Sequence, residues 1–302
     1  MKVYKPLPIR LLTHNIRYAT NAPFKGEEKW VIRKPRLINE LSFNTAHAES
    51  FICLQEVLHQ QLLDILSGLN SRLNNEKKVW DYVGVGRDDG KQAGEYSPIL
   101  YRPDIWEPKT QKTKWLSKTP DRPSKSWDAA STRILTIAVF QHRSTGKTVV
   151  GMNTHLDDQG SKSRLEAAKI ILEQIRLFTN QVPYQKSPPI FLTGDFNSEP
   201  EQEAYNEMTS PTSPMADLQM MVPENERYGD SNTFTGFDSK NRKRIDFIFV
   251  NKEDTSLASS NSKIDTPERW WLVEGYAVLS NRFEDRVYNS DHQVVVGDLT
   301  IL

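Results

Sequence analysis

The stretch "FLTGDFNSEP", residues 191–200, begins as a buried strand and ends in short polar side chains. Residues 191–193 are typical of a strand, and Gly194 allows a tight turn. Asp195 and Asn197 lie two positions apart, so they point the same way if the extended geometry persists. A simple turn is an equally good interpretation of this stretch alone, because Asp, Asn, Gly and Pro all favour turns. The rest of the chain must decide between a turn and a site.

Other strand-like runs recur along the chain, at 9–16, 50–57, 97–103, 134–141, 148–156, 190–196, 244–250 and 292–302. Several are continuously apolar or β-branched, which is typical of strands buried on both faces. Helical spacing of apolar residues predicts helices at 34–46, 58–73 and 161–180. Segments 84–96, 102–132 and 200–242 are expected to be loop-rich. The alternation predicts an α/β sandwich, with residues 1–302 forming a single domain.

Composition restricts the classes of protein that fit. The 302 residues carry 39 Lys and Arg against 39 Asp and Glu, which argues against affinity built on many phosphates of a long nucleic acid. The single cysteine, Cys53, lies in an apolar run and is expected to be a buried thiol. Apolar runs are too short to span a bilayer, and the N-terminus lacks a secretory signal. We therefore expect an intracellular monomer without a membrane anchor.

Polar residues gather where the strand-like runs end, although a hydrophobic core has no need of them there. They are Asn15, Glu56, Asn153, His155, Asp195, Asn197, Asp246, Asp291 and His292. Strand ends often carry ligands and catalytic groups, because a rigid sheet fixes the geometry of the loops. Asp246 is the hardest to explain as structure alone, since a charge between Ile245 and Phe247 is costly to bury unless it is paired.

These residue types suit hydrolysis of a phosphate ester. Glu56 and Asp291, with Asn15 nearby, offer the oxygen ligands that Mg²⁺ prefers. Asp246 could orient His292 and raise its basicity for proton transfer.

The remaining polar groups have roles in the same chemistry. Asp195 could hold or deprotonate a water, while Asn197 and His155 could donate to the negative charge of a phosphoryl transition state. The sequence contains no Cys/His cluster for structural zinc, no Walker-type phosphate loop and no G-x-S-x-G elbow.

Six blocks, in this order, resemble the endonuclease/exonuclease/phosphatase superfamily: "THNIR", "LQE", "NTHL", "GDFNSEP", "RIDFIFV" and "SDHQVVV". The resemblance implies a four-layer α-β-β-α sandwich with two facing mixed sheets and a Mg²⁺-dependent site, at which Mn²⁺ can substitute, on one rim. The segments 115–133 and 94–101 resemble a poorly characterised bacterial and fungal branch.

The resemblance also implies roles for individual residues. Asn15, Glu56 and Asp291 match metal-site positions, and Asp195 and Asn197 match the pair that positions the attacking water and the phosphate. The carboxylate–histidine pair is matched by Asp246 and His292, the second histidine by His155, and its supporting carboxylate by Glu95. Asp195 and Asn197 are therefore interpreted as catalytic rather than as a turn.

The predicted substrate is a phosphate ester, with nucleic acid among the candidates. The main hypothesis is a phosphodiesterase or nuclease, in which Trp127 stacks on the substrate and Arg133 and Arg17 contact phosphate. Loop packing is an equally good explanation for Trp127. A second hypothesis is a phosphomonoesterase acting on a nucleotide, sugar or inositol phosphate. A third is a non-catalytic binding scaffold, which the filled set of site positions disfavours.

Overall fold

The computed structural model describes residues 6–46, 49–71, 79–179, 187–252 and 270–302. Its strands are β1 (Leu7–Asn15), β2 (Ser50–Gln55), β3 (Asp81–Val83), β4 (Ile99–Tyr101), β5 (Trp106–Trp115), β6 (Ile134–His142), β7 (Thr148–His155), β8 (Ile190–Asp195), β9 (Met215–Asp217), β10 (Tyr228–Gly229), β11 (Asp246–Asn251), β12 (Trp271–Leu279) and β13 (Val294–Ile301). The helices are α1 (Trp30–Asn44), α2 (His59–Ser71), α3 (Ser161–Thr179), α4 (Glu203–Thr209) and α5 (Leu218–Met221), with a 3₁₀ turn at Glu224–Glu226.

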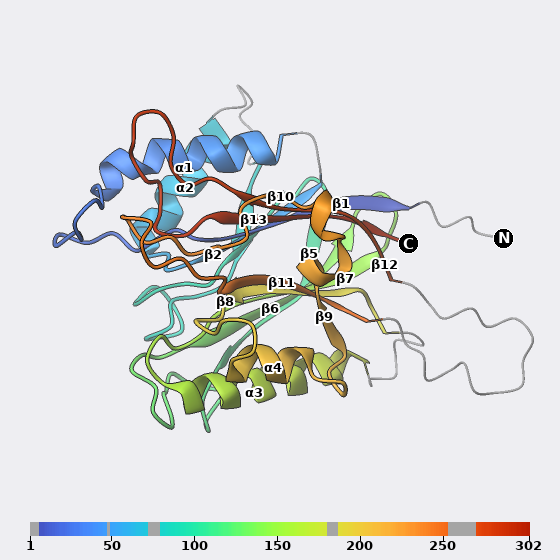
Figure 1. Ribbon diagram of the computed structural model, residues 1–302. Helices are drawn as coiled ribbons and strands as arrows, with labels where there is room; N and C mark the ends of the chain where they lie inside the picture. The colour runs from blue at the N-terminus through green and yellow to red at the C-terminus, as the bar shows by residue number, and fades with distance from the viewer. Residues whose placement is uncertain (1–5, 47–48, 72–78, 180–186, 253–269) are drawn as a thin grey trace, which may run out of the picture.

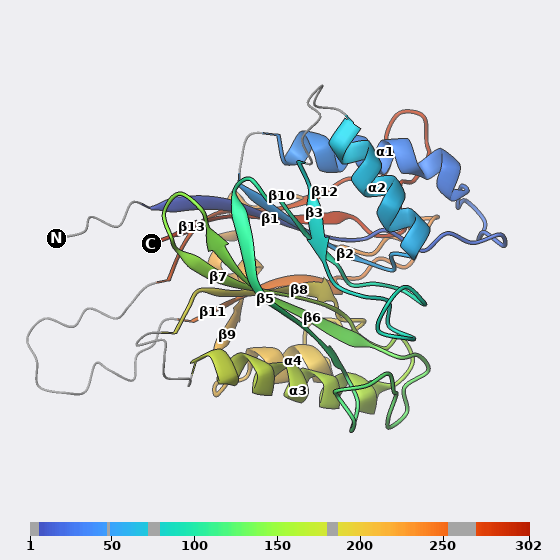
Figure 2. The same ribbon diagram turned by 180° about the vertical axis from the view of Figure 1, so that it is seen from behind.

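Two mixed sheets face each other in the centre of the molecule. One has the strand order β10-β12-β13-β1-β2-β4-β3, and the other has the order β5-β6-β7-β8-β11-β9. Helices α1 and α2 cover the first sheet, and α3 and α4 cover the second, so the four layers are visible from the front (Figure 1) and from behind (Figure 2). The predicted α-β-β-α sandwich is confirmed.

Three apolar layers hold the four structural layers together. Between the sheets, the Phe51 ring centroid lies 4.9 Å from those of Trp106 and Phe140 and 5.3 Å from that of Phe191. A second cluster lies between α3 and its sheet, and a third lies between α1, α2 and theirs. Cys53 is fully buried in the layer between the sheets, as expected, and burial raises its pKa to about 12. Burial of this apolar surface is the main stabilising contribution to the fold.

Two of the three segments expected to be loop-rich contain regular structure. Strand β5 lies within 102–132, and α4, β9, α5 and β10 lie within 200–242. Strand β5 is an edge strand with a polar, exposed centre, and lysines on edge strands discourage pairing with other chains, so its sequence lacks the apolar signal of a central strand. Strand β12, which was not predicted, has one exposed face and a register shift between Val273 and Gly275. Segment 84–96 contains no helix or strand, as predicted.

Within the described ranges, no helix combines the length and apolar character needed to cross a bilayer.

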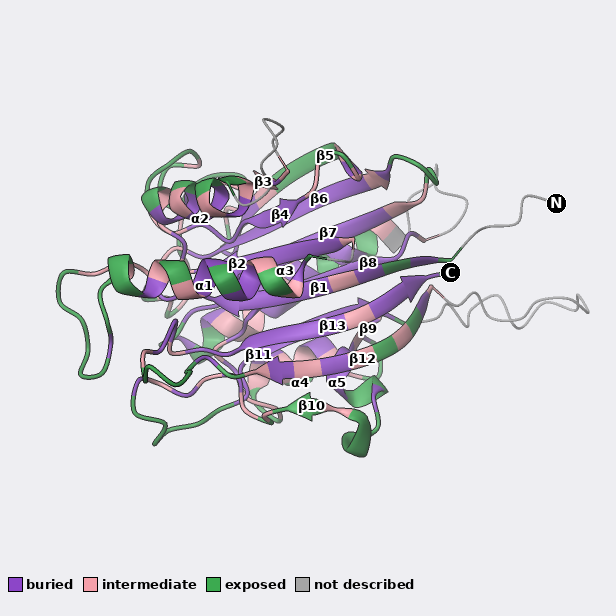
Figure 3. Cartoon of the chain, turned by 90° about the horizontal axis from the view of Figure 1, so that it is seen from above, coloured by how far each residue is buried: buried purple, intermediate pink, exposed green. Residues whose placement is uncertain are grey.

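Helix α1 begins at Trp30, earlier than the predicted start at residue 34, and Pro35 lies inside it. Seen from above, α1 and α2 lie over the part of their sheet that contains β1, β2 and β4, whereas β12 and β10 lie beside them without a helix above (Figure 3). One end of the seven-stranded sheet therefore keeps its outer face uncovered by a helix.

Candidate active site

Strand register places three of the predicted residues side by side. Asp195 at the end of β8 pairs with His155 on the parallel strand β7 and with Asp246 on the antiparallel strand β11. The preceding residue, Gly194, has φ +154, and a Cβ there would lie 2.3 Å from the carbonyl oxygen of Thr154. Glycine therefore lets β7 and β8 approach closely where these functional side chains leave the sheet.

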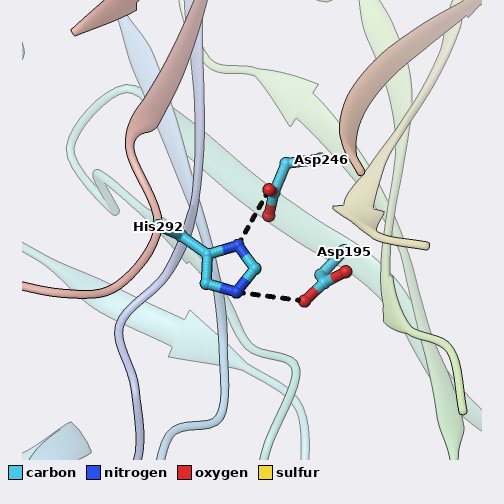
Figure 4. A group of neighbouring side chains, drawn as sticks. All are labelled: Asp195, Asp246 and His292. Carbon is cyan, nitrogen blue, oxygen red and sulfur yellow. Dashed lines mark hydrogen bonds and ion pairs between the residues drawn. The ribbon is translucent and has the colours of Figure 1, made fainter. Parts of the chain in front are cut away.

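Asp246 and His292 form a buried pair beside Asp195 (Figure 4). The Nδ1 of His292 lies 2.8 Å from Oδ2 of Asp246, and its Nε2 lies 3.6 Å from Oδ2 of Asp195. Burial opposes protonation of His292, but the charges of Asp246 and Asp195 outweigh it and raise the pKa of His292 to about 10. Burial and the charge of Asp246 raise the pKa of Asp195 to about 7. This geometry can keep His292 protonated beside Asp195, a carboxyl group that can accept or release a proton.

Asn15 and Glu56 meet where two parallel strands end. Asn15 is paired with Gln55, and Glu56 follows directly in a left-handed conformation with φ 58. The Nδ2 of Asn15 donates to Oε1 of Glu56 at 3.0 Å and to Oδ2 of Asp195 at 2.9 Å. Ser290, the neighbour of Asp291, donates its hydroxyl to the carbonyl of Asn15 at 2.6 Å. The amide of Asn15 thus joins two carboxylates, and the loop that carries Asp291 is fixed next to it.

The charge distribution at this position fits a hard cation. Burial and the nearby charge of Glu56 raise the pKa of Asp291, against the opposing effect of His292. Buried carboxyl groups whose ionisation is disfavoured would be neutralised by a bound cation. Glu56 and Asp291 provide carboxylate oxygens, the ligand type that Mg²⁺ takes. The Nδ2 of Asn15 faces the carboxylates, and its Oδ1 accepts a hydrogen bond from the backbone N–H of Arg17 at 3.0 Å.

Asp195, Asp246 and His292 form a second group whose ligand atoms lie within 4.8 Å of one another, so this group could also bind a metal. The Nδ1 of His292 is already engaged by Asp246 at 2.8 Å. A histidine that is hydrogen-bonded to a carboxylate through one ring nitrogen is typical of proton transfer as well as of metal binding. Both groups are therefore candidate cation sites.

His155 lies on the other side of Asp195. Its Nε2 is 3.1 Å from Nδ2 of Asn197 and 3.5 Å from Oδ2 of Asp195, while its Nδ1 is 3.8 Å from Oε2 of Glu95. Burial, followed by the positive charges of Arg133 and Arg87, lowers the pKa of His155 well below its usual value. The structure therefore brings Glu95 beside the second histidine without a direct hydrogen bond, and it favours a neutral imidazole there.

Two of the three residues predicted to contact the substrate, Arg17 and Arg133, are buried beside the site. Arg17 is 8% exposed, and its Nε donates to Oε1 of Glu27 at 3.2 Å. Its Nη1 lies 3.7 Å from Oε2 of Glu56. Arg133 is 6% exposed, and its Nη2 donates to Oδ1 of Asp158 at 2.8 Å. Two of its nitrogens, Nε and Nη1, are buried without a hydrogen-bond partner among the described residues.

Trp127 is half-buried, and its predicted stacking on a substrate stays a prediction. Among the described residues, the hydrogen bonds, ion pairs and ring contacts of the catalytic group do not include it. The neighbouring Asp128 accepts hydrogen bonds from the backbone N–H groups of Ser163 at 2.7 Å and Lys162 at 3.2 Å. The segment that carries Trp127 is therefore attached to the first turn of α3, which is compatible with loop packing and with stacking on a substrate.

Sequence reasoning missed two arginines. Arg87 donates from Nη1 to Oε2 of Glu95 at 2.7 Å, which places a second guanidinium beside His155. Arg33 on α1 donates to the carbonyls of Ile16 at 2.8 Å, Arg17 at 3.0 Å and Asn289 at 2.8 Å, so it ties together the two loops that flank the cation site. The only available signal for Arg87 was its position in the same loop as Glu95.

Two stacked mixed sheets with a carboxylate–histidine cluster at the strand ends define the α-β-β-α sandwich class of hydrolases. The chain belongs to the endonuclease/exonuclease/phosphatase family, whose model matches residues 12–292. Members of this family are hydrolases that act on phosphoester bonds, and they typically use divalent metal ions.

Three solved structures are similar to the chain over nearly its whole length. An endonuclease/exonuclease/phosphatase from Bacteroides vulgatus is 30% identical, with a TM-score of 0.77 and coverage of 98% of this chain and 99% of that one. A family protein from Bacteroides thetaiotaomicron is 29% identical, with a TM-score of 0.81 and coverage of 99% and 97%. The mannosyl-6-phosphatase Bt3783 of the same species is 29% identical, with a TM-score of 0.77 and coverage of 96% and 99%. No curated protein matches the sequence significantly.

Proposed function

We propose that this protein is a Mg²⁺-dependent phosphatase that hydrolyses a small phosphate monoester, with a sugar phosphate as the leading substrate class. The observation that carries the chemistry is His292, held at 2.8 Å by Asp246 and facing Asp195 at 3.6 Å. Glu56, which accepts a hydrogen bond from the amide of Asn15, provides carboxylate oxygens nearby. When bound by Asn15, Glu56 and Asp291, Mg²⁺ supplies charge neutralisation and polarisation of a phosphoryl oxygen.

The other side chains of the site bind water, transfer protons and stabilise charge. Asp195 holds the attacking water, because its Oδ2 faces both histidines and can accept a proton. Protonated His292 donates to an oxygen of the phosphoryl group or of the leaving group, and Asp246 stabilises the imidazolium. Asn197 is oriented by its own backbone N–H, which donates to Oδ1 of Asp195 at 2.9 Å, and its amide contributes a donor to the developing charge.

The substrate class rests on two further observations. The mannosyl-6-phosphatase is 29% identical over nearly the full length of both chains, which favours a monoester over the phosphodiester expected from sequence. Arg17, Arg87 and Arg133 surround the catalytic group, and a terminal phosphate carries more negative charge than a diester to interact with them. The zero net charge of the chain is also compatible with a small substrate.

A substrate panel tests this proposal. Phosphate release is measured from mannose 6-phosphate, glucose 6-phosphate and p-nitrophenyl phosphate, and cleavage is measured for bis-p-nitrophenyl phosphate and for short DNA and RNA. Each assay is run with Mg²⁺ and with excess EDTA, and His292→Ala is the inactive control. We expect the monoesters to be hydrolysed fastest and only with metal. Cleavage of diesters with inert monoesters would instead assign a phosphodiesterase, and no cleavage at all would favour the binding scaffold.

A further inference from the structure

A large groove lies on the outer face of the seven-stranded sheet, next to the loop that carries Asp291 and His292. Of its lining residues, Gln293 follows His292 in the chain, and the N–H of Thr235 donates to the carbonyl of Asp291 at 2.8 Å. The groove has a volume of about 1340 Å³ and is bounded by α1, by β10 and by the end of β12 with the loop that follows. These elements frame the part of the sheet that has no helix above it (Figure 3). Most pockets for single small molecules are about 300–1,000 Å³, so this groove has room for more than one ring.

Helix α1 forms one wall of the groove with a side that the core does not use. Leu37 and Leu41 are fully buried against the sheet. Arg36, Glu40 and Phe43 follow one another at intervals of four and three residues, so they share a different stripe of the helix, and all three line the groove. This wall of the groove therefore carries a guanidinium group, a carboxyl group and an aromatic ring in one row along α1.

Three aromatic rings line the groove from three separate elements. Phe43 of α1 is 82% exposed, Tyr228 of β10 is 72% exposed, and Phe283 after β12 is 52% exposed. Large apolar side chains with this much exposure at one depression are typical of an interaction site. Because the rings come from different walls, they do not form the single apolar stripe that a docked helix requires.

The charged groups of the groove are largely matched with one another. Arg36 donates from Nε to Oδ2 of Asp285 at 2.5 Å, and Arg242 pairs with Asp230. Such pairs hold guanidinium and carboxylate planes in fixed positions but leave little net field. This pattern disfavours a nucleic acid or a strongly acidic ligand, each of which needs unmatched positive charge.

One wall also contains a buried carboxyl group whose hydrogen bonding is incomplete. Glu40 is 7% exposed, and its Oε2 accepts a hydrogen bond from Nδ2 of Asn289 at 2.5 Å. Its Oε1, together with Oδ1 of Asn289, has no hydrogen-bond partner among the described residues. Buried oxygens of this kind are normally satisfied, so an internal water is the expected donor beside this wall.

From these features we infer that the groove is a binding site for a neutral oligosaccharide. A sugar ring offers an apolar face to an aromatic side chain and hydroxyl groups that both donate and accept. Three exposed rings on different walls offer stacking faces for sugar rings, and the arginine–carboxylate pairs offer donors and acceptors for hydroxyl groups. The groove is lined by none of the residues assigned to the catalytic cluster, and the inference does not rest on the proposed phosphatase activity.

Calorimetric titration of the full chain with neutral oligosaccharides tests the inference. The ligands are hexaoses of α-linked glucose, β-linked glucose, β-linked xylose and α-linked mannose. We expect at least one to bind saturably with a dissociation constant below about 1 mM. The double substitution Phe43→Ala and Tyr228→Ala should weaken this binding about tenfold or more, because two stacking surfaces are removed. The matched control is Leu177→Ala, an exposed residue on α3 on the opposite side of the molecule, which should bind as the unmodified chain does.

Thermal unfolding and phosphate release should be unchanged in the double variant, which shows that a loss of binding is local. Two results would overturn the inference: none of the hexaoses binds, or the double variant binds as tightly as the unmodified chain. Peptides selected by phage display that require Phe43 and Tyr228, in the absence of any sugar binding, would reassign the groove to a peptide.

Discussion

Replacing Asp246 by asparagine removes one charge from the centre of the catalytic group without removing a hydrogen-bonding atom. Asp246 is fully buried, and its Oδ2 lies 2.8 Å from Nδ1 of His292. It is the largest of the carboxylate contributions that keep the pKa of His292 at about 10 in spite of burial. The amide of Asp246→Asn can still accept a hydrogen bond, but it cannot stabilise an imidazolium. We therefore expect kcat/KM to fall by roughly 10²–10⁴, equivalent to about 3–5 kcal/mol of transition-state stabilisation.

Two measurements on the same variant separate catalysis from folding. Steady-state phosphate release gives the rate, and an NMR titration of the imidazole signals in the metal-free protein gives the pKa of His292, which should be lower than in the unmodified chain. Asp298→Asn is the matched control, since Asp298 forms a partly exposed pair with Arg10 at 2.6 Å far from the site. A folded Asp246→Asn protein with an unchanged rate and an unchanged His292 pKa would refute the reasoning and make Asp246 structural.

The geometry supports three further predictions. Arg87→Met should raise KM for a phosphate monoester about tenfold, measured by steady-state kinetics, and Arg87→Lys should raise it less. An unchanged KM in Arg87→Met would show that Arg87 does not contact the substrate. Burial raises the pKa of Glu40 to about 8, so its stabilising effect is complete below the usual value of 4.5 and disappears as the pH rises towards 8. In Glu40→Gln, the fall in unfolding free energy between about pH 5 and pH 8 should be smaller by a few kcal/mol, measured by urea denaturation at several pH values. The same fall with pH in the variant and in the unmodified chain would contradict this. Turnover of a small ester should depend weakly on salt, whereas a steep loss from about 50 to 200 mM salt would indicate many phosphate contacts.

The sequence was sufficient to predict the fold and the proximity of Asp195, Asp246 and His292, because both depend on the order of residues along the strands. Asp195, Asp246 and His292 each follow or begin an apolar run, and the sheet brings such positions to one rim. The blocks around them are long enough to specify a family, which the match over residues 12–292 confirms.

The sequence could not identify features that depend on interactions between distant segments. A single arginine such as Arg87 carries no local signal, because its role arises only when loop 84–96 places it 2.7 Å from Glu95. The attachment of Asp128 to the first turn of α3 was likewise invisible in the sequence, because it joins segments 35 residues apart. Strand β5 was missed because an edge strand has few buried positions.

The most direct test of the central claim is the dependence of phosphate release on Mg²⁺ in the unmodified chain and in Glu56→Gln. The measurement uses the best substrate of the panel, with Mg²⁺ titrated into protein that has been treated with EDTA. Glu56 lies 3.0 Å from the amide of Asn15 and supplies one of the two carboxylates assigned to the cation. We predict no activity without metal, saturable recovery with Mg²⁺ in the unmodified chain, and a loss of at least about 10²-fold in a folded Glu56→Gln protein. Full activity in excess EDTA, or a Glu56→Gln variant with an unchanged rate and Mg²⁺ dependence, would contradict the account.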